Sequence, residues 1–332
     1  MLLTPAPLLQ AFPCGIPWRA LVRRPTPVQH VGALGGAAIW VKRDDKAGLP
    51  YGGNKVRKLE FLLAAALEGG SRAIVTTGGT GSHHVLACGI HGRAAGLDVH
   101  AVTFPQPMTE HSEAVSRATA AWGVRRWPVA SKLTLPLTVR RALRAASPAS
   151  LIAPGGSWGA GVLGYADAAF ELAEQVRSGA CPKPDLVVVP SGTGGTHAGL
   201  LLGLALAGLG DIQVQGVAVV DKVFCNAPLT AAAARSGAQA LRREGVALPR
   251  TRVTAADVRL DRGFLGPGYA HITPEATEAL ATGKDLGITL DTTYSAKAFA
   301  WLLAAARSGA LGGRTVMFWL TYDDRVPLPS SP

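Results

Sequence analysis

Cysteine is scarce in this chain of 332 residues, and its four copies lie far apart. Cys14, Cys88, Cys181 and Cys225 form no C-x-x-C pair, so the spacing indicates neither a structural zinc site nor a disulfide framework. Free thiols are typical of a reducing compartment. We therefore expect a cytoplasmic protein that holds no metal.

Long apolar runs are also missing. The longest, residues 198–210, is well short of the about 20 residues that a membrane-spanning helix needs. The N-terminal segment is apolar, but prolines interrupt it and it lacks the basic residues that begin a signal peptide. The sequence predicts no association with a membrane.

Charged residues make up only 17% of the chain, although the formal net charge is +11. The basic residues are mostly arginines spread along the sequence, and no DNA- or RNA-binding motif accompanies them. This distribution favours a solvated basic surface that suits small anionic substrates. A nucleic-acid binder remains an alternative that only the net charge supports, and we expect no nucleic-acid partner.

Short β-branched runs alternate with longer Ala- and Leu-rich segments. This alternation is typical of βα units and predicts an α/β fold with open, mostly parallel sheets flanked by helices. A chain of this length favours two lobes. The expected strands are 38–41, 73–77, 99–104, 124–128, 186–190, 214–220 and 315–320. The expected helices are 55–68, 83–95, 110–122, 135–146, 160–177, 195–207, 228–244, 274–282 and 296–307.

The stretch Gly52-Gly53-Asn54-Lys55 places a lysine where a loop becomes a helix. An amine attacks an aldehyde only when it is neutral, and a helix N-terminus in a dry cleft disfavours the ammonium form. Lys55 is therefore a candidate reactive amine. Lys58, one turn later, is predicted to be a charge on the helix surface, because lysine is seldom buried.

A second loop, Ser191-Gly192-Thr193-Gly194-Gly195-Thr196, follows a buried-strand pattern and precedes a helix. Such a loop lets several backbone N–H groups converge on one phosphate, and the helix N-terminus adds positive potential. It is neither a Walker A loop nor a dinucleotide fingerprint. A glycine-rich turn that only packs the helix against the strand is the alternative.

A third loop, residues 76–84, again runs from a strand end through glycines to a helix that Ser82 would cap. A serine hydroxyl beside free amide groups suits a carboxylate. The alternative is an ordinary capped helix with His83 and His84 on its surface, and for His84 taken alone the surface position is favoured. All three loops would open at the carboxyl ends of parallel strands, where α/β proteins bind ligands.

Residues 52–60, GGNKVRKLE, resemble the cofactor-lysine motif of the fold type II pyridoxal-phosphate enzymes, in the group of D-cysteine desulfhydrase and 1-aminocyclopropane-1-carboxylate deaminase. The similarity extends from residue 41 to Thr321. It implies that Lys55 forms the Schiff base with pyridoxal 5'-phosphate and that Asn54 hydrogen-bonds the cofactor's phenolic oxygen. It also implies a catalytic or substrate-binding role for Ser82.

The resemblance implies further site residues. The phosphate loop would be Gly192, Thr193, Gly194, Gly195 and Thr196, the substrate would lie near Ser82, His83 and His84, and the two active-site tyrosines would be Tyr269 and Tyr294. Both tyrosines could also be ordinary packing residues, an alternative that has more weight for Tyr269. Thr321 would face the pyridine nitrogen, and a neutral hydroxyl there suits elimination more than transamination.

The sequence departs from the group's pattern at several positions. His83 stands where the group usually has Asn, Tyr322-Asp323 where the family commonly has Gly-Gly, and Ser295 where the deaminases carry Glu. The change at Ser295 weakens the deaminase interpretation. The other two changes permit a pyridoxal-phosphate-binding protein that has lost turnover.

The function implied by the resemblance is α,β-elimination on a small amino acid, with a 2-keto acid and ammonia as products, as in D-cysteine desulfhydrase. The alternatives are 1-aminocyclopropane-1-carboxylate deaminase or another pyridoxal-phosphate amino-acid enzyme. The resemblance also implies a larger lobe of residues 1–50 and 162–332, a smaller inserted lobe of residues 51–161, and a homodimer.

Overall fold

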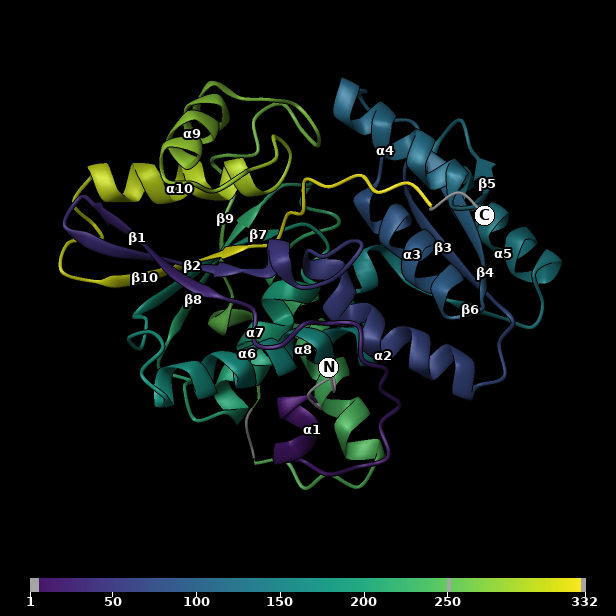
Figure 1. Cartoon of the computed structure of the whole chain (residues 1–332), viewed down its shortest axis with the longest axis horizontal. Helices are drawn as coiled ribbons and strands as arrows, with labels where there is room; N and C mark the ends of the chain where they lie inside the picture. The colour runs from purple at the N-terminus through teal and green to yellow at the C-terminus, as the bar shows by residue number, and fades with distance from the viewer. Residues whose placement is uncertain (1–5, 250–251, 330–332) are drawn as a thin grey trace.

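The computed structural model describes residues 6–249 and 252–329. Within them the chain forms two separate sheets, one of six strands in the order β1-β2-β10-β7-β8-β9 and one of four in the order β5-β4-β3-β6 (Figure 1). Every neighbouring pair is parallel except β1 and β2, which pair antiparallel. The predicted α/β fold with mostly parallel sheets is confirmed.

The strands of the described residues are short, and most are flanked by helices. They are β1 (Val28–Leu34), β2 (Ala37–Arg43), β3 (Ala73–Gly79), β4 (Asp98–Phe104), β5 (Arg125–Pro128), β6 (Ala149–Leu151), β7 (Leu186–Ser191), β8 (Gln213–Ala218), β9 (Arg259–Asp261) and β10 (Thr315–Leu320). The helices are α1 (Pro7–Ala11), α2 (Asn54–Glu68), α3 (His83–Ala94), α4 (Glu110–Ala121), α5 (Leu135–Ala145), α6 (Ala160–Arg177), α7 (Gly195–Leu206), α8 (Ala227–Arg243), α9 (Pro274–Asp285) and α10 (Ser295–Arg307). None of these helices is long and apolar enough to span a bilayer.

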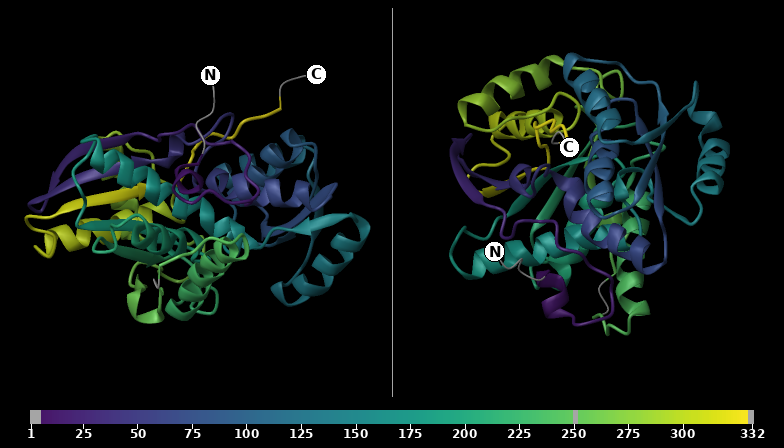
Figure 2. Two further views of the ribbon diagram at one scale, coloured as in Figure 1. Left: turned by 90° about the horizontal axis from the view of Figure 1, so that it is seen from below. Right: turned by 45° about the vertical axis from the view of Figure 1, so that its right-hand side comes forward.

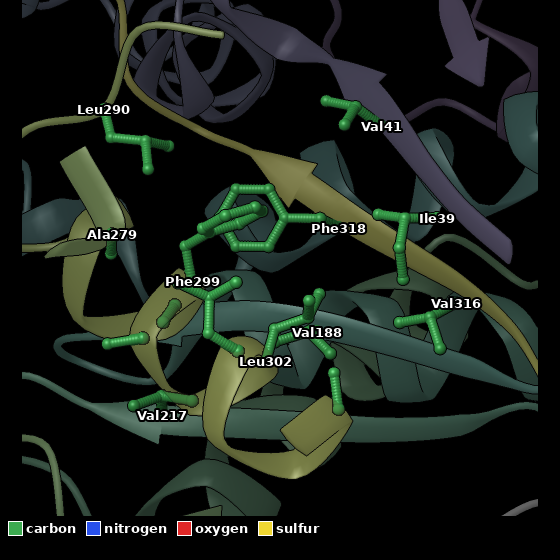
Figure 3. Packing of buried hydrophobic residues seen from close by; sticks show 14 of the residues in the cluster. Ile39, Val41, Val188, Val217, Ala279, Leu290, Phe299, Leu302, Val316 and Phe318 are labelled. Atoms are coloured by element: carbon green, nitrogen blue, oxygen red, sulfur yellow. The ribbon is translucent and has the colours of Figure 1, made fainter. Parts of the chain in front are cut away.

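The six-stranded sheet is covered on both faces, as the apolar run of β10 requires. Alternate residues of β10 point to opposite sides: Val316 and Phe318 pack against α10, whereas Met317 and Trp319 pack against α6 and α7. Figure 3 shows the α10 face, where the rings of Phe299 and Phe318 meet edge to face at 5.1 Å between centroids. This packing fixes the carboxyl end of β10.

The four-stranded sheet is built entirely from residues 73–151 and carries α3 on one face and α5 on the other. It lies beside the six-stranded sheet, not within it, in all the views of Figures 1 and 2. Helix α2 contacts both α6 and α3 and so lies between the two sheets. The N-terminus of α2 therefore faces the space between the two halves.

The segment after β10 crosses from the six-stranded half to the four-stranded half, as its yellow trace shows in Figure 1. There Trp122, just after α4, donates a hydrogen bond of 2.8 Å to the carbonyl oxygen of Pro327. Val326 packs among the residues that cover α3. The last described residues thus hold the two halves together.

A buried charge cluster ties the segment before α2 to α6. Arg57 lies 2.8 Å from Asp44 and 3.0 Å from Glu171, and Lys42 lies 2.5 Å from Glu171. All four side chains are at most 1% exposed. Such buried pairs hold only when each charge keeps its partner, so the cluster fixes α2 relative to α6.

The seven predicted strands and nine predicted helices are all present, with ends shifted by a few residues. No strand end is shifted by more than two residues; for example, the strand expected at 214–220 ends at Ala218. Strands β1, β6 and β9 were not predicted. Strand β1 pairs with β2 as a hairpin, and its exposed positions recur at every third residue, so it lacks the alternation that marks a strand. Strands β6 and β9 have three residues each and depend on their neighbours in the sheet.

Candidate active site

The predicted reactive lysine lies at the first turn of α2, beside the glycine-rich loop that precedes α7. The Lys55 Nζ atom donates to the side-chain oxygen of Asn54 at 2.8 Å. The Asn54 Nδ2 atom in turn donates to Oγ1 of Thr196 at 3.2 Å. Two hydrogen bonds thus connect the candidate amine to the candidate phosphate loop.

The Lys55 side chain is half-buried and faces the pocket. Burial lowers the pKa of Lys55 from its usual value of 10.5 to about 8, against an opposing effect of Asp291. A substantial fraction of this amine is therefore neutral near physiological pH, as attack on an aldehyde requires.

Gly53 brings the start of α2 against the end of β10. Its φ of 73° lies in the left-handed region, and a Cβ atom there would lie 2.9 Å from the carbonyl oxygen of Thr321. The Asn54 N–H donates to that same oxygen at 3.0 Å. Glycine is required at this position because no side chain fits between the two segments.

The glycine-rich loop between β7 and α7 is shaped by close contacts on three sides. Gly194 has a φ of 78° and caps α7 in the left-handed conformation. A Cβ atom at Gly195 would lie 2.5 Å from the Cα of Ser157, and one at Gly192 would lie 3.1 Å from the ring of Tyr294. The absence of side chains leaves the first amide groups of α7 open toward the pocket, a favourable arrangement for an anion.

The prediction that Lys58 is a surface charge is wrong. Lys58 is only 3% exposed and its Nζ atom donates to the carbonyl oxygen of Gly155 at 3.0 Å. Gly155 adjoins the side chain of Thr193, since a Cβ atom there would lie 2.5 Å from Thr193 Oγ1. Burial, and then the charge of Lys55, lowers the pKa of Lys58 well below its usual value. An anion in the adjacent loop would offset that cost.

The short 3-10 helix η3 (Pro154–Gly156) and Ser157 were missed as part of the site. Their only predicted place was within the smaller lobe of residues 51–161. Ser157 Oγ lies 2.5 Å from Thr193 Oγ1, and Pro154 and Gly155 line the pocket. The Gly-Gly-Ser composition was a usable signal for a close approach of backbone to backbone.

Ser82 caps α3, as predicted, and its hydroxyl accepts from the amide of Val85 at 3.5 Å. It lines the pocket together with His83 and His84. The expectation that His84 is on the surface is wrong, because the residue is 6% exposed and its Nε2 atom lies 2.9 Å from Oγ1 of Thr76. That bond anchors His84 to β3, so its ring has a structural partner.

Tyr269 and Tyr294 come together although 25 residues separate them, with 3.2 Å between their hydroxyl oxygens. The Lys55 ammonium lies 6.0 Å from the centroid of the Tyr294 ring. Burial raises the pKa of Tyr294 and that of Tyr269. Both hydroxyls therefore carry their protons at physiological pH.

Asp291 is a site residue that the motifs did not predict. Its carboxylate accepts from the backbone N–H groups of Thr293, Tyr294 and Ser295 at 2.8–3.0 Å. These bonds form the turn that presents Tyr294 to the pocket. An acidic residue just before a helix is a capping signal that could have identified it.

A chain of aromatic side chains was also missed, apart from His83. Tyr51 hydrogen-bonds His83 Nδ1, His83 Nε2 lies 3.1 Å from His111 Nε2, and Tyr322 Oη lies 3.0 Å from the same His111 atom. The residues come from the loop before α2, from α3, from α4 and from the crossing after β10. No local pattern in the sequence places His111 or Tyr322 beside His83.

Together these residues enclose a cavity of about 680 Å³ between the two halves. Thr321 lies at its wall, buried at the end of β10. The described residues contain no cluster of three His, Cys, Asp or Glu side chains that could hold a metal ion. The Lys55 amine can react with an aldehyde, and the loop of residues 192–196 can hold a phosphate. These residues therefore fit pyridoxal phosphate.

Comparison with known proteins supports the same cofactor. Residues 20–321 match the family model described as pyridoxal-phosphate dependent enzyme. The chain is 33% identical over 320 residues to a nocardicin C-9' epimerase of Nocardia uniformis subsp. tsuyamanensis, covering 93% of this chain and 94% of that protein. It is 32% identical over 298 residues to a D-cysteine desulfhydrase of Klebsiella pneumoniae (strain 342), covering 85% and 86%.

A solved structure described as an ACC deaminase homologue superposes with a TM-score of 0.80 at 28% identity. The match covers 96% of this chain and 94% of the other. Family, cofactor and fold thus agree with the expectation from residues 52–60. The chain belongs to the pyridoxal-phosphate dependent enzymes of fold type II.

Proposed function

We propose that this enzyme is a lyase that removes a β-substituent from a small amino acid such as D-cysteine and yields a 2-keto acid and ammonia. The observation that carries the proposal is the position of Lys55. Its amine has a pKa of about 8 and is linked through Asn54 to Thr196 of the anion loop. The D-cysteine desulfhydrase relative supports the substrate class.

When bound, pyridoxal phosphate supplies an electron sink for negative charge on the α-carbon of the substrate. The loop from Gly192 to Thr196 and the buried Lys58 would hold its phosphate, Asn54 its phenolic oxygen, and Thr321 its ring nitrogen. Ser82 and the first amide groups of α3 would hold the substrate carboxylate. In this arrangement the cofactor and the substrate carboxylate are held from opposite halves of the molecule.

Two proton transfers fall to residues of this chain. The neutral amine of Lys55 takes the α-proton, because its lowered pKa keeps it available as a base. The Tyr269–Tyr294 pair, protonated because burial raises both pKa values, gives a proton to the departing β-substituent. Separate acid and base groups avoid the need for one residue to change its role during the step.

A deaminase acting on 1-aminocyclopropane-1-carboxylate is the less favoured alternative. Ser295 is fully buried, and its hydroxyl donates to Asp291 at 2.6 Å. Position 295 therefore supports the turn before α10 and presents no acidic group to the substrate. This arrangement favours elimination from an open-chain amino acid.

Epimerisation at the α-carbon is a second candidate, supported by the nocardicin C-9' epimerase relative. The observation in its favour is the Tyr51–His83–His111 group, which provides acid–base groups in addition to Lys55. Epimerisation would exchange and invert the α-hydrogen without loss of a β-substituent.

The test is a panel of D- and L-amino acids incubated with the loaded enzyme. We expect keto acid and sulfide from D-cysteine above all. Inversion of the substrate without keto acid would instead support the epimerase. Neither product from any amino acid, with the cofactor visibly bound, would show a binding protein without turnover and overturn the proposal.

We also propose that residues 51–161 act as the smaller lobe and that the enzyme is a cytoplasmic homodimer. The four-stranded sheet within residues 73–151 supports the lobe assignment, and the four free cysteines are compatible with a reducing compartment. The dimer rests on the family resemblance alone. Light scattering of the purified protein tests it, and a monomer at micromolar concentration would contradict it.

A further inference from the structure

Besides Lys55 and the Tyr269–Tyr294 pair, the pocket holds a second set of groups that can transfer protons. This set consists of Tyr51, His83 and His111. Tyr51 is 2% exposed, whereas His111 is half-buried and adjoins the exposed Glu110. His83 lies between them and bonds one neighbour with each ring nitrogen. The hydrogen bonds thus lead from the pocket interior toward solvent.

The atoms allow two arrangements of protons. In the first, Tyr51 donates its hydroxyl proton to Nδ1 of His83, and His83 Nε2–H donates to Nε2 of His111. In the second, His111 Nε2–H donates to Nε2 of His83, and His83 Nδ1–H donates to the oxygen of Tyr51. Only in the second is the Tyr51 hydroxyl proton free to point at a substrate, because the tyrosine then accepts from His83.

We propose that Tyr51, His83 and His111 form a proton relay that exchanges protons between solvent and the substrate pocket, with Tyr322 as the residue that positions His111. Tyr322 Oη lies 3.0 Å from the His111 nitrogen that the relay uses, and its ring packs edge-on against the ring of His83 at 5.3 Å. The inference rests on the proposed function for the identity of its substrate. The hydrogen bonds of the relay can be tested without a substrate.

Each proton can be followed when the relay delivers one proton from solvent to the substrate. Tyr51 gives its hydroxyl proton to the α-carbon, whose electron pair forms the new C–H bond, and takes a proton from His83 Nδ1. His83 Nε2 takes a proton from His111 Nε2, and His111 Nδ1 takes one from water, which leaves hydroxide in the solvent. The relay thus passes from the second arrangement to the first with no net charge of its own, and the reverse passage removes a proton from the substrate and returns it to that hydroxide.

The neutral state of the rings suits this role. Burial, and then the proximity of His111, lowers the pKa of His83 to about 4, so a neutral ring with one exchangeable proton persists at physiological pH. The charged groups that face the cluster are Lys55, Asp291, Asp323, Asp324 and Arg325. The opposite signs of these charges partly cancel at His83.

The first test needs no cofactor. Long-range ¹H–¹⁵N spectra of the histidine-labelled chain without cofactor should show a neutral His83 near pH 7, with ring-nitrogen shifts that reflect its hydrogen bonds to Tyr51 and His111. Tyr51→Phe removes one hydroxyl and should shift the ring nitrogens of both histidines. Tyr165→Phe, which removes the buried hydroxyl that donates to Asp44 at 2.8 Å, is the matched control and should leave them unchanged. Ring-nitrogen chemical shifts of His83 and His111 that do not change in Tyr51→Phe would overturn the relay.

The second test uses the loaded enzyme in D₂O with an amino acid that lacks a β-leaving group, such as alanine. We expect deuterium at the α-carbon, and at least tenfold less of it in Tyr51→Phe and in His111→Gln at equal cofactor occupancy. Exchange unchanged in both variants would overturn the inference. If wild type shows no exchange while the ring-nitrogen shifts respond to Tyr51→Phe, the relay stands and the proposed substrate class fails.

Discussion

Asn54 and Thr196 are joined by a hydrogen bond of 3.2 Å, although 142 residues separate them in the chain. Asn54 begins α2 and Thr196 lies in the first turn of α7, so two helix N-termini face the same pocket. The same asparagine accepts from Lys55 at 2.8 Å. The two hydrogen bonds therefore fix the candidate amine relative to the anion loop.

Replacing Lys55 with alanine should abolish the covalent attachment of the cofactor and all elimination. The variant should lack the absorbance at about 410–430 nm that the lysine-bound cofactor gives. Lys284→Ala, on the exposed face of α9, is the matched control and should retain both. A Lys55→Ala protein with the band and activity intact would disprove the assignment of the amine.

The rate at which the chain without cofactor captures pyridoxal phosphate should rise with pH, with a midpoint near 8. Burial lowers the pKa of Lys55 to about 8, and only the neutral form, which predominates above that pH, attacks the aldehyde. The absorbance change after mixing at pH 6 to 9.5 measures this rate. A rate independent of pH in this range would contradict the lowered pKa.

Lys58→Met should weaken binding of pyridoxal phosphate at least tenfold, which corresponds to about 1.4 kcal/mol. Methionine keeps the apolar length of the side chain but loses the buried cation next to Gly155 and Thr193. Binding of pyridoxal, which has no phosphate, should change little. Equal losses for both ligands would mean that Lys58 supports the fold and not the phosphate. Lys284→Met is the surface control.

His83→Asn should move the substrate preference of the enzyme. The ring bonds Tyr51 and His111, and the smaller amide cannot reach both. We expect the ratio of kcat/KM values for D-cysteine and a bulkier D-amino acid to change at least fivefold. His30→Asn, at an exposed histidine outside the pocket, should leave this ratio as it is. Unchanged ratios in His83→Asn would show that the ring has no part in selecting the substrate.

Glu171→Gln should lower the free energy of unfolding by about 3–5 kcal/mol, because it leaves the buried Lys42 without its ion-pair partner and leaves Arg57 with Asp44 alone. Burial alone would raise the pKa of Glu171, but Arg57 and Lys42 lower it below its usual value. Stability from this group is present above the unfolded pKa of about 4.5 and is lost as the pH falls toward the lowered value. The variant should therefore lose less stability on acidification than the wild type.

Urea unfolding measures both effects. Glu278→Gln breaks an exposed ion pair with Arg307, which water and salt screen, and should cost far less stability than Glu171→Gln. Similar losses in the two variants would show that the buried cluster contributes no more than a surface pair.

The order of strands and helices could be predicted because most elements carry their own periodicity and glycine ends. Strands β6 and β9 could not, since three residues contain no period and their pairing depends on distant neighbours. Lys58 was misplaced for a similar reason: its burial depends on Gly155, 97 residues away. The residues around Lys58 in the sequence do not indicate that contact.

The candidate site shows the same division. Lys55, Ser82 and the 192–196 loop lie at strand-to-helix junctions, where local motifs are strong, and the structure brings them to one pocket. Tyr51 and His111 have no motif of their own, and their proximity to His83 follows only from how the two halves pack. The roles of these residues and the boundary at residues 51–161 stay predictions.

The segment after β10 contributes Thr321 and Tyr322 to the pocket and then fastens to α4 through Pro327 and Trp122. A rotation of one half about the other must therefore bend this segment at the very residues that line the cavity. The wall formed by Thr321, and the placement of His111 through Tyr322, therefore depend on the same connection between the two halves. Shortening the chain before Pro327 would remove the Trp122 bond that secures this connection.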